Sequence, residues 1–443
     1  MQLNFSAPQE VLDTIATIGR TEDLRFSPDH RRLAVAAILR AQIFVFDIEV
    51  RSTPTGKQVH LGAVVELSSD HLFAPHGLDF VDNDILAVAN REGELCLFRL
   101  PPRDGLAKAE LSLLQSFPST ERELLGPGSV AASQRADGKH ELLVCRNFGH
   151  RISRHVLDAT KGYAHCEERV LLGKWLEIPD GISIDPARRW LAVSSHNTQS
   201  VLLYSYADAL HAESDPEAVL RGASYPHGLR FSVDGRYLLL ADAGAPYVHV
   251  YHQPDGHWQG VYDPHLSLRV MNDALFHSGN QNPQEGGPKG IDIDCHAGIL
   301  VTSCQTQTLA FFDLDPLLAS VKRSGPLELL DGSASAPTVA MNVRHELKKQ
   351  QRHAQTVTTA MLRERQAAHA EQRAVEAEQR ATEAAWRARE AEERTLHTEA
   401  LLEEMAKRAR YFETRTQALL ASSSWRITAP LRRLLSLRRR QQV

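Results

Sequence analysis

Histidines, carboxylates and a lysine recur in this sequence at intervals of about fifty residues, each in the middle of a Pro-x-Gly phrase or a variant of it. Read along the chain, these middle positions are Glu22, His76, Gly128, Asp180, His227 and Lys289. Carboxylates and imidazoles suit acid–base chemistry and are competent ligands of a divalent metal ion. A lysine in the same set argues against a metal site, because it brings a positive charge of its own. A polar lining of a wet channel is the simpler reading.

These residues belong to a longer repeat, in which the phrase is followed by an apolar strand, a short turn and a second apolar strand. Its clear copies are PHGLDFVDNDILAVAN from Pro75, PDGISIDPARRWLAVSS from Pro179, PHGLRFSVDGRYLLLAD from Pro226 and PKGIDIDCHAGILVTSC from Pro288. Weaker copies begin at Pro127 and Glu22. Asp, Gly and Pro stand at the turns, as hairpins require.

Each copy reads as a β-hairpin followed by a third and usually a fourth strand. A four-stranded unit of about fifty residues cannot bury both of its faces alone, so successive copies must pack around an axis. Six copies predict a mainly β fold, a six-bladed β-propeller over residues 1–332. Residues 10–19 are expected to form the outer strand of the last blade and to close the ring. A β-sandwich is the alternative, but sandwiches do not repeat in this way.

In such a blade the first strand lines the channel and the end of the second strand returns to the same rim. The ends of the second strands are Ala37, Asn90, Asn147, Ser195, Asp242 and Cys304. The predicted rim-binding residues are Glu22, His76, Asn90, Asn147, Asp180, His227, Asp242 and Lys289. The pattern singles out no catalytic residue among them.

One connection is longer than the others. Residues 254–287 stretch the interval between the fifth and sixth copies, and they include His257, Trp258, Tyr262, His265, Asn272, Asp273 and His277. Long loops on a rigid scaffold often carry function. The segment is expected to be a lid or a carbohydrate-contacting loop over the rim. An insertion that touches nothing is the alternative.

The composition changes after Pro337. Residues 338–421 contain neither Gly nor Pro and are rich in Ala, Glu, Arg and Gln, which predicts one long helix or coiled coil of about 120 Å. A heptad track runs Leu347, Ala354, Met361, Ala368, Val375, Thr382 with mostly polar partners, and a firmer seam runs Leu402, Met405, Ala409, Phe412, Thr416, Leu419. Residues 401–420 are expected to join two or three copies of the chain. A solvated single helix is credible for 348–395 alone.

Residues 422–443 predict a short basic amphipathic helix that docks on a membrane surface. Six arginines and no acid occur there, and an apolar set is spaced between them. The predicted docking residues are Trp425, Arg426, Leu431, Arg432, Arg433, Leu434 and Leu435. Anionic lipid of the inner membrane is the expected partner.

Charge and cysteine content exclude several classes of protein. Residues 1–337 carry 29 Lys/Arg against 42 Asp/Glu, so nucleic-acid binding by this part is not expected. The five cysteines are scattered and unpaired by spacing, which excludes a zinc ribbon or a disulfide framework. No apolar stretch is long enough to span a membrane and no signal peptide is recognisable, so the chain is expected in the cytoplasm, peripheral on the inner membrane.

The phrase PHGLRFSVDGRYLLLAD resembles the repeat of lactonase-type propellers, the gluconolactonase and regucalcin group, and the resemblance covers residues 1 to about 330. It implies one divalent cation at the axis, held by a Glu of the first blade, an Asn and an Asp. Glu22 and Asp180 stand where two of these ligands would be expected, and His76 and His227 take the places of the family's Asn. Glu22, Asp180 and His227 form the candidate metal site. No other cofactor is expected.

The string SSSWRITAPLR (422–432) is similar to a segment at the end of many bacterial glycosyltransferases and methyltransferases of surface-polysaccharide assembly. The resemblance implies a place, the inner face of the cytoplasmic membrane in an O-antigen or capsule system. The chain lacks a recognisable transferase domain. We therefore expect a noncatalytic propeller scaffold, or a module binding a glycan or a partner enzyme. The alternative is a metal-dependent lactonase-like or sugar-directed hydrolase.

Overall fold

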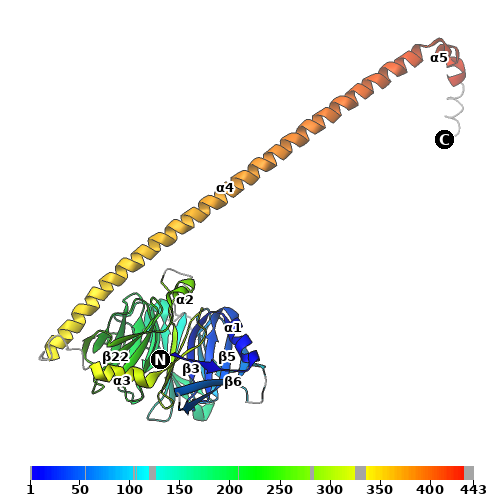
Figure 1. Ribbon diagram of the computed structural model, residues 1–443. Coiled ribbons are helices and arrows are strands. Elements are labelled where there is room, and N and C mark those ends of the chain that lie inside the picture. The colour runs from blue at the N-terminus through cyan, green and yellow to red at the C-terminus, as the bar shows by residue number, and fades with distance from the viewer. Residues whose placement is uncertain are drawn as a thin grey trace. The chain divides into compact units, whose positions relative to one another are not determined.

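The computed structural model describes residues 2–54, 56–102, 105, 107–118, 126–207, 209–279, 284–324 and 336–433. Its contacts divide the chain into two compact units, 1–358 and 359–443. The first unit is a six-bladed β-propeller, and the fold prediction is thereby confirmed (Figure 1).

Six antiparallel sheets form the blades, and in each the strands follow one another outward from the axis. Blade 1 consists of β3 (Thr21–Phe26), β4 (Arg32–Ala37), β5 (Gln42–Thr53) and β6 (Gly56–Ser68). Blade 2 consists of β7 (Pro75–Phe80), β8 (Ile85–Asn90), β9 (Leu95–Arg99) and β11 (Ser112–Phe117). Blade 3 consists of β12 (Pro127–Gln134), β13 (His140–Arg146), β14 (Arg151–Asp158) and β15 (Ala164–Leu172). Blade 4 consists of β16 (Pro179–Ile184), β17 (Trp190–Ser195), β18 (Ser200–Ser205) and β19 (Ala218–Leu220). Blade 5 consists of β20 (Pro226–Phe231), β21 (Tyr237–Asp242), β22 (Tyr247–His252) and β24 (Leu266–Arg269). Blade 6 consists of β25 (Gly290–Asp294), β26 (Ile299–Ser303), β27 (Ala310–Asp313) and β1 (Gln2–Leu3).

Three short strands extend these sheets at their outer edges. β2 (Phe5–Ser6) and β10 (Lys108–Glu110) pair in parallel with β6, and β23 (Gly260–Tyr262) pairs in parallel with β19. The hydrophobic core lies between neighbouring blades. One such cluster joins Leu24 and Phe44 of blade 1 to Phe311 of blade 6. Because each sheet is covered on both faces, its second strand is buried along its whole length, which explains the unbroken apolar runs of the repeat.

The amino terminus closes the ring, but not through the predicted segment. β1 pairs antiparallel with β27, so Gln2 and Leu3 supply the outer strand of the last blade. Residues 10–19 were expected to do this, and that expectation is wrong, because α1 (Gln9–Ile18) is a helix. Val11, Ile15 and Ile18 are spaced by four and three, and this helical period places all three against the core cluster between blades 1 and 6.

The long connection 254–287 is largely built into the blades rather than forming a lid. It contains β23, β24 and α2 (Asp273–Ser278), which Asn272 caps by accepting a hydrogen bond from the Leu275 amide at 2.9 Å. Trp258 and Tyr262 are buried between blades 4 and 5, so they are core residues and not carbohydrate contacts. Residues 280–283 lie outside the described residues.

Helix α3 (Leu314–Ser324) follows the last blade and buries Leu314, Leu317 and Val321 between blades 5 and 6. Helix α4 (Ala336–Ala421) begins within the first unit. Val343 and Leu347 lie in the core cluster between blades 3 and 4, and Ala354 is also buried. The predicted heptad track therefore begins with residues that face the propeller.

The second unit contains the rest of α4 and the short helix α5 (Ser423–Ile427). Ser422 separates α4 from α5: its backbone is extended, and its hydroxyl accepts a hydrogen bond from the Trp425 amide at 3.3 Å. Among the described residues, no helix has an apolar stretch long enough to cross a membrane.

Candidate functional site

A β-bulge at the start of the inner strand brings the repeated phrase to the axis. In five blades the pairing register of the first strand shifts within or directly after the Pro-x-Gly phrase, for example between Pro179 and Ile182 or between Pro226 and Leu229. A bulge bends the strand and re-aims the side chain at the extra residue. In the blades that carry both a bulge and a side chain at the middle position, that side chain is thereby turned toward the centre of the ring.

The glycine of the phrase is required because neighbouring inner strands approach closely here. A Cβ added at Gly77 would lie 2.4 Å from the Cα of Ser129, and one at Gly181 would lie 2.0 Å from the carbonyl oxygen of His227. Any side chain would therefore separate the blades at the axis.

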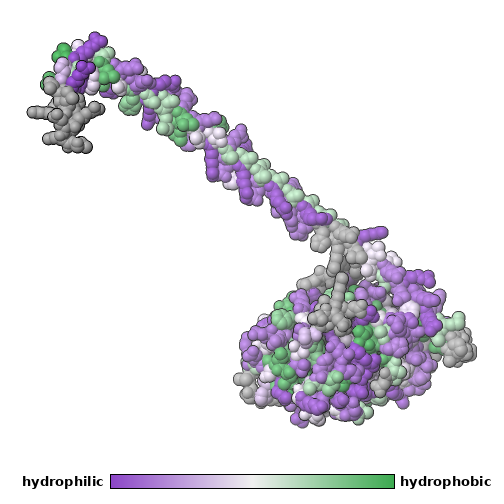
Figure 2. All heavy atoms as spheres, turned by 180° about the vertical axis from the view of Figure 1, so that it is seen from behind, coloured by the Kyte–Doolittle hydropathy of each residue, from purple (hydrophilic) through white to green (hydrophobic). Residues whose placement is uncertain are grey.

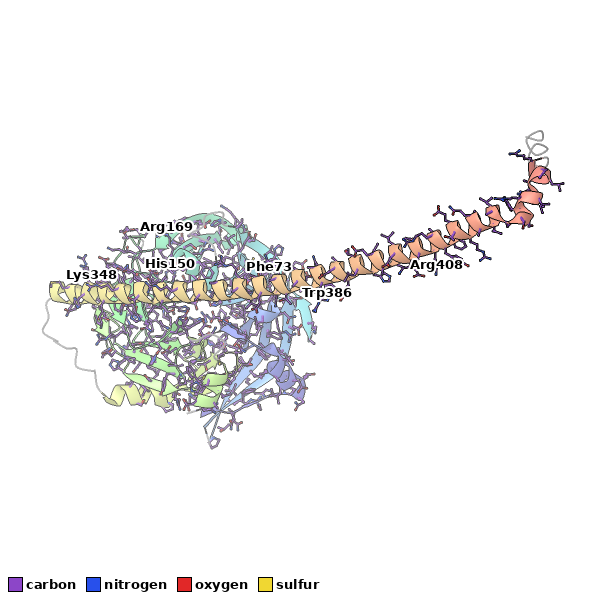
Figure 3. All side chains as sticks on the ribbon, turned by 90° about the horizontal axis from the view of Figure 1, so that it is seen from above. Phe73, His150, Arg169, Lys348, Trp386 and Arg408 are labelled. Carbon is purple, nitrogen blue, oxygen red and sulfur yellow. The ribbon has the colours of Figure 1, made fainter. Side chains whose placement is uncertain are left out.

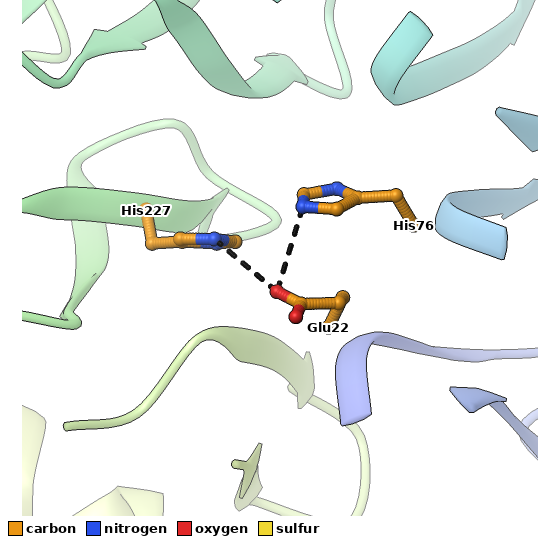
Figure 4. Close-up of side chains that lie close together, drawn as sticks. All are labelled: Glu22, His76 and His227. Atoms are coloured by element: carbon orange, nitrogen blue, oxygen red, sulfur yellow. Dashed lines mark ion pairs between the residues drawn. The ribbon is translucent and has the colours of Figure 1, made fainter. Parts of the chain in front are cut away.

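Five of the six middle positions meet in one cluster. The Nε2 atoms of His76 and His227 lie 3.4 and 3.8 Å from Glu22 Oε2 (Figure 4). His227 Nε2 also lies 2.7 Å from Asp180 Oδ2, and Lys289 Nζ lies 2.9 Å from Glu22 Oε2. The sequence placed these five residues together, and the fold does the same.

The sixth middle position is Gly128, and Asn147 occupies the space that a side chain there would fill. A Cβ at position 128 would overlap Asn147 Oδ1, while Asn147 Nδ2 donates a 2.6 Å hydrogen bond to Asp180 Oδ1. Asn147, predicted from the end of the second strand, is thus part of the cluster.

Asn90 and Asp242 were predicted for the same rim but do not reach the cluster. Asn90 Oδ1 accepts a hydrogen bond from the Phe73 amide at 3.1 Å. Asp242 accepts bonds from the amides of Ser224 and Tyr225, both at 2.7 Å, and its Oδ2 lies 3.1 Å from His249 Nε2. Both side chains accept hydrogen bonds from backbone amides of the loop before the inner strand of their blade.

Four further residues complete the cluster, and the sequence repeat did not identify them. Arg20 bonds Glu22 and lies 3.3 Å from Glu285, which in turn lies 2.5 Å from Lys289 Nζ. Arg91 lies 2.5 Å from His76 Nε2 and 3.4 Å from Asp180. His196 Nε2 lies 3.2 Å from the other oxygen of Asp180. None of the four occupies the middle position of a Pro-x-Gly phrase. Arg91 and His196 do share a position of the repeat, directly after the end of the second strand, and that position could have identified them.

The cluster has a buried layer and a partly exposed layer. Glu22, His76, Asp180, His196, His227 and Lys289 are each less than one-tenth exposed, whereas the side chains of Arg20, Arg91 and Glu285 are 26%, 22% and 16% exposed. A molecule approaching the rim therefore meets two arginines and one glutamate first.

Burial and neighbouring charges fix the protonation of the buried layer. Burial alone would raise the pKa of Glu22, but Lys289, His76 and Arg20 hold that pKa well below its usual range. The pKa of Asp180 is likewise lowered against the effect of burial, by His227, His76 and His196. Burial and then the Arg91 guanidinium lower the pKa of His76 to about 3, and burial lowers that of His196. The carboxylates are thus charged and His76 is neutral at pH 7.

Two groups of side chains within the cluster could hold a metal ion, and they share His227; a third group, His155, His165 and Glu168, lies on blade 3, outside the cluster. Glu22, His76 and His227 form one group, and Asp180, His196 and His227 form the other, with ligand atoms within 4.8 Å of one another in each. The predicted trio Glu22, Asp180 and His227 is thus divided between them. A cavity of about 10 Å³ lies beside these residues, room for one water or ion.

Charge balance argues against a divalent cation in the arrangement observed. Three carboxylates (Glu22, Asp180 and Glu285) already face three cations (Arg20, Arg91 and Lys289). A metal ion would add two charges that no remaining anion of the cluster neutralises, and Glu22 would have to exchange Lys289 for it. The donor atoms suit a metal, but the charges do not.

The channel beneath the cluster is closed by a second charged layer. Arg25 lies 2.7 Å from Asp23 and 3.7 Å from Asp79, and Arg230 lies 3.1 Å from Asp292. The three carboxylates also accept backbone hydrogen bonds from the next blade, as Asp79 does from Ala132 at 2.8 Å. This layer joins the blades and confines the site to one rim.

The predicted membrane-docking residues lie in and after α5. Trp425 is 40% exposed and Leu431 is 63% exposed, and the guanidinium of Arg432 stacks on the Trp425 ring at 3.6 Å. Arg426 and Arg433 belong to the same segment. Leu434 and Leu435 lie outside the described residues.

These observations define a six-bladed β-propeller with a buried polar cluster at one rim. No protein-family profile and no curated protein matches the chain. Among solved structures it is similar to a putative gluconolactonase (14% identity, 66% of this chain and 88% of that one, TM-score 0.42). It is also similar to a gluconolactonase from Xanthomonas campestris (15%, 66% and 85%, 0.43) and to a luciferin-regenerating enzyme (11%, 68% and 94%, 0.44). At this level of similarity, the activities of these proteins cannot be inferred for the chain.

Proposed function

We propose that the chain is a noncatalytic recognition module that binds a glycan or a partner protein at the inner face of the cytoplasmic membrane, in the assembly of a surface polysaccharide. The propeller rim would bind the ligand, the long helix would join copies of the chain, and the basic tail would dock on anionic lipid. The resemblance of Ser422–Arg433 to the tails of polysaccharide-assembly enzymes supports the setting.

The observation that carries the noncatalytic part is the closed ion network around Glu22. Arg20 and Lys289 occupy the Glu22 carboxylate, and three imidazoles together with Asn147 surround Asp180. A nucleophile or general base needs a free lone pair directed at a substrate. Both carboxylates are instead paired with cations or imidazoles and almost completely buried, although Asp180 Oδ2 accepts no hydrogen bond among the described residues.

The outer layer of the rim supports recognition of an acidic glycan. Arg91 stacks on the ring of Phe148 at 5.6 Å, and Phe73 lies next to the same turn, its carbonyl accepting a bond from the Glu92 amide at 3.4 Å. Phe148 is 62% exposed and Phe73 is 52% exposed. Guanidinium groups bind carboxylates, and exposed aromatic faces offer stacking surface to sugar rings.

A glycan array of bacterial surface polysaccharides tests this proposal with the purified full chain. We expect binding to acidic glycans, at least tenfold weaker for Arg91→Ala and unchanged for the control Arg99→Ala on strand β9. Circular dichroism would establish that both variants are folded. Binding to no glycan on the array, or binding that Arg91→Ala leaves unchanged, would contradict glycan recognition at this rim.

A lactonase-like or sugar-directed hydrolase is the second candidate, because two groups of metal-competent side chains meet at His227. Metal analysis of the purified chain and a lactone hydrolysis screen, with Asp180→Ala as the control, distinguish the two functions. One bound divalent cation and turnover that Asp180→Ala abolishes would establish the hydrolase and refute the noncatalytic proposal.

A further inference from the structure

A stripe of large apolar side chains runs along the last third of α4 without any contact that covers it. Leu402, Met405, Phe412 and Leu419 are 61%, 66%, 62% and 55% exposed. With Ala409 and Thr416 between them, their spacing alternates between three and four residues, so all six lie on one side of the helix. Figure 2 shows apolar residues running along α4 between hydrophilic ones.

The same spacing continues toward the start of the unit with smaller residues. Going back from Leu402, the positions are Thr398, Thr395, Ala391, Ala388, Ala384, Ala381, Ala377 and Ala374, and all are exposed. This series, from Ala374 to Leu419, is here called the seam. It differs from the track through Val375 and Thr382 that the sequence first suggested. Alternation of three and four over more than six heptads is the pattern of a coiled coil.

The two flanks of the seam carry opposite charges. On one flank, the position directly after every second seam residue is acidic at Glu378, Glu392, Glu399 and Glu413 and apolar at Ala385, Ala406 and Leu420. On the other, directly before the alternate seam residues, stand Arg380, Arg387, Arg394, Arg408 and Arg415. In Figure 3, Arg408 projects from the side of α4.

These flanks select one orientation of a partner helix. In a parallel, in-register pair each arginine faces the residue five positions further along the other helix. Arg387, Arg394 and Arg408 then face Glu392, Glu399 and Glu413 of the second copy, whereas Arg380 and Arg415 face Ala385 and Leu420. In an antiparallel pair the same flanks meet, so arginine would face arginine and glutamate would face glutamate. Charge complementarity therefore favours the parallel arrangement.

The bonds already present within the helix are compatible with this pairing. Arg387 and Arg394 each bond the glutamate four residues earlier, Glu383 and Glu390, at 2.6 Å, and Arg408 bonds Glu404 at 2.8 Å. A guanidinium has five N–H donors, so it can keep this bond and still donate across the seam.

We propose that residues 374–419 form a parallel, in-register coiled coil with a second copy of the chain. This deepens the proposed function, because it specifies the partner of the long helix, the relative direction of the two helices and the length of their contact. Parallel pairing brings the two basic tails out at the same end of the seam. The proposal does not depend on what the propeller binds.

Cysteine cross-linking of the full chain tests the direction. In a Cys166→Ser background, which removes the exposed native thiol, Ala381→Cys places a thiol in the seam well away from its midpoint. A parallel pair brings the two thiols together, and mild oxidation should convert most of the chain into a disulfide-linked dimer. The matched control Ala400→Cys lies on the opposite face of the helix and should remain uncross-linked. Absence of the Ala381→Cys dimer, or equal cross-linking of the control, would overturn the proposal.

Charge reversal gives a second, independent readout by sedimentation equilibrium. The wild-type chain should have the mass of two copies, and a single-copy mass at micromolar concentration would overturn the proposal. Arg387→Glu with Arg394→Glu should weaken the dimer at least tenfold, and adding Glu392→Arg and Glu399→Arg should restore it. If Arg387→Glu with Arg394→Glu strengthened the dimer instead, the helices would pair antiparallel and the proposal would be overturned. Helicity measured in parallel would show whether any variant has unfolded. The comparison of the wild type with Arg91→Ala on the glycan array tests the rim and not the seam, so failure of the coiled-coil proposal and failure of the recognition proposal are distinguishable.

Discussion

At the scale of single residues, Lys289 has the central role in the rim cluster. Its ammonium lies within 2.9 Å of Glu22 and 2.5 Å of Glu285, two carboxylates that no other lysine reaches among the described contacts. It supplies positive charge beside Glu22, one of the residues that could otherwise hold a metal ion. The cluster is therefore held together by its own side chains.

Replacing Lys289 by methionine should destabilise the propeller strongly. A buried charge that loses its partner costs about 3–5 kcal/mol, and Glu22 would keep only Arg20 and the imidazoles. Urea unfolding near neutral pH measures the loss. The control is Lys161→Met, because Lys161 is 73% exposed and pairs only with Asp158 at 3.5 Å. It should cost less than about 1 kcal/mol. Equal losses would show that the network around Glu22 contributes little.

His76 should make stability depend on pH in a defined direction. In the folded chain its pKa is lowered to about 3 from an ordinary value of 6.5, so between these limits only the unfolded chain takes up the proton. The free energy of unfolding should therefore fall as the pH falls below 6.5, by about 1.4 kcal/mol per pH unit from this residue. His76→Gln should remove that part of the slope. Urea unfolding at several pH values between about 4 and 7 checks this, and parallel curves for the two proteins would refute it.

The sequence located the cluster through its repeat but could not assign every side chain. Glu22, His76, Asp180, His227 and Lys289 share one position of the repeat at the start of the inner strand, so the repeat alone brings them together. Asn90, Asn147 and Asp242 share another position, yet only Asn147 turns inward, because Gly128 leaves room for it. Asn and Asp serve equally well as ligands and as caps of backbone amides. Which role they take depends on the neighbouring blade.

At the scale of elements, the first turns of α4 belong to the propeller. Besides the buried Val343 and Leu347, Arg344 bonds Asp215 at 3.0 Å and Asn197 donates to Thr358 at 3.2 Å. Asn197 directly follows His196 of the rim cluster. The helix is thus anchored to blade 4 beside the candidate site.

Leu347→Ala should therefore destabilise the propeller itself. Removing a leucine side chain that is 2% exposed leaves a cavity and costs about 2–5 kcal/mol. Leu396→Ala is the matched control, because Leu396 is 61% exposed and lies outside the seam. It should change stability by less than about 0.5 kcal/mol. Thermal unfolding followed by near-ultraviolet circular dichroism, which reports the aromatic core of the propeller, would separate the two. A loss of stability no larger than that of the control would mean that the contact of α4 with blade 4 does not stabilise the propeller.

The elements that the sequence misjudged are those whose partners come from elsewhere in the ring. Residues 10–19 occupy the place of an outer strand in the repeat, but Gln2 and Leu3 take that place and leave α1 to pack on the side of blade 1. Trp258 and Tyr262 looked available for a ligand, yet β23 carries them into the edge of blade 4. The six blades themselves followed from the repeat because each copy contains its own hairpin and turn residues.

At the scale of the whole molecule, two weak contacts are expected to act together. One basic tail with exposed Trp425, Ile427 and Leu431 offers limited apolar area to a bilayer, and each arginine near an anionic surface contributes about 1 kcal/mol. A parallel seam would bring two tails to the same surface. After the first has bound, the second binds at a high effective concentration, so the avidity of the pair should greatly exceed the affinity of one tail.

Flotation with vesicles containing phosphatidylglycerol separates the contributions of tail and seam. The wild-type chain should float with the vesicles, and a chain lacking residues 422–443 should stay in solution while remaining dimeric. Leu402→Glu with Phe412→Glu should break the seam and leave the tail intact, and its binding should be at least tenfold weaker than that of the wild type. High salt should weaken all binding, because the attraction is between arginines and lipid phosphates. If the seam variant bound as tightly as the wild type, each tail would be acting alone. If the truncated chain still floated, the membrane contact would lie outside the tail.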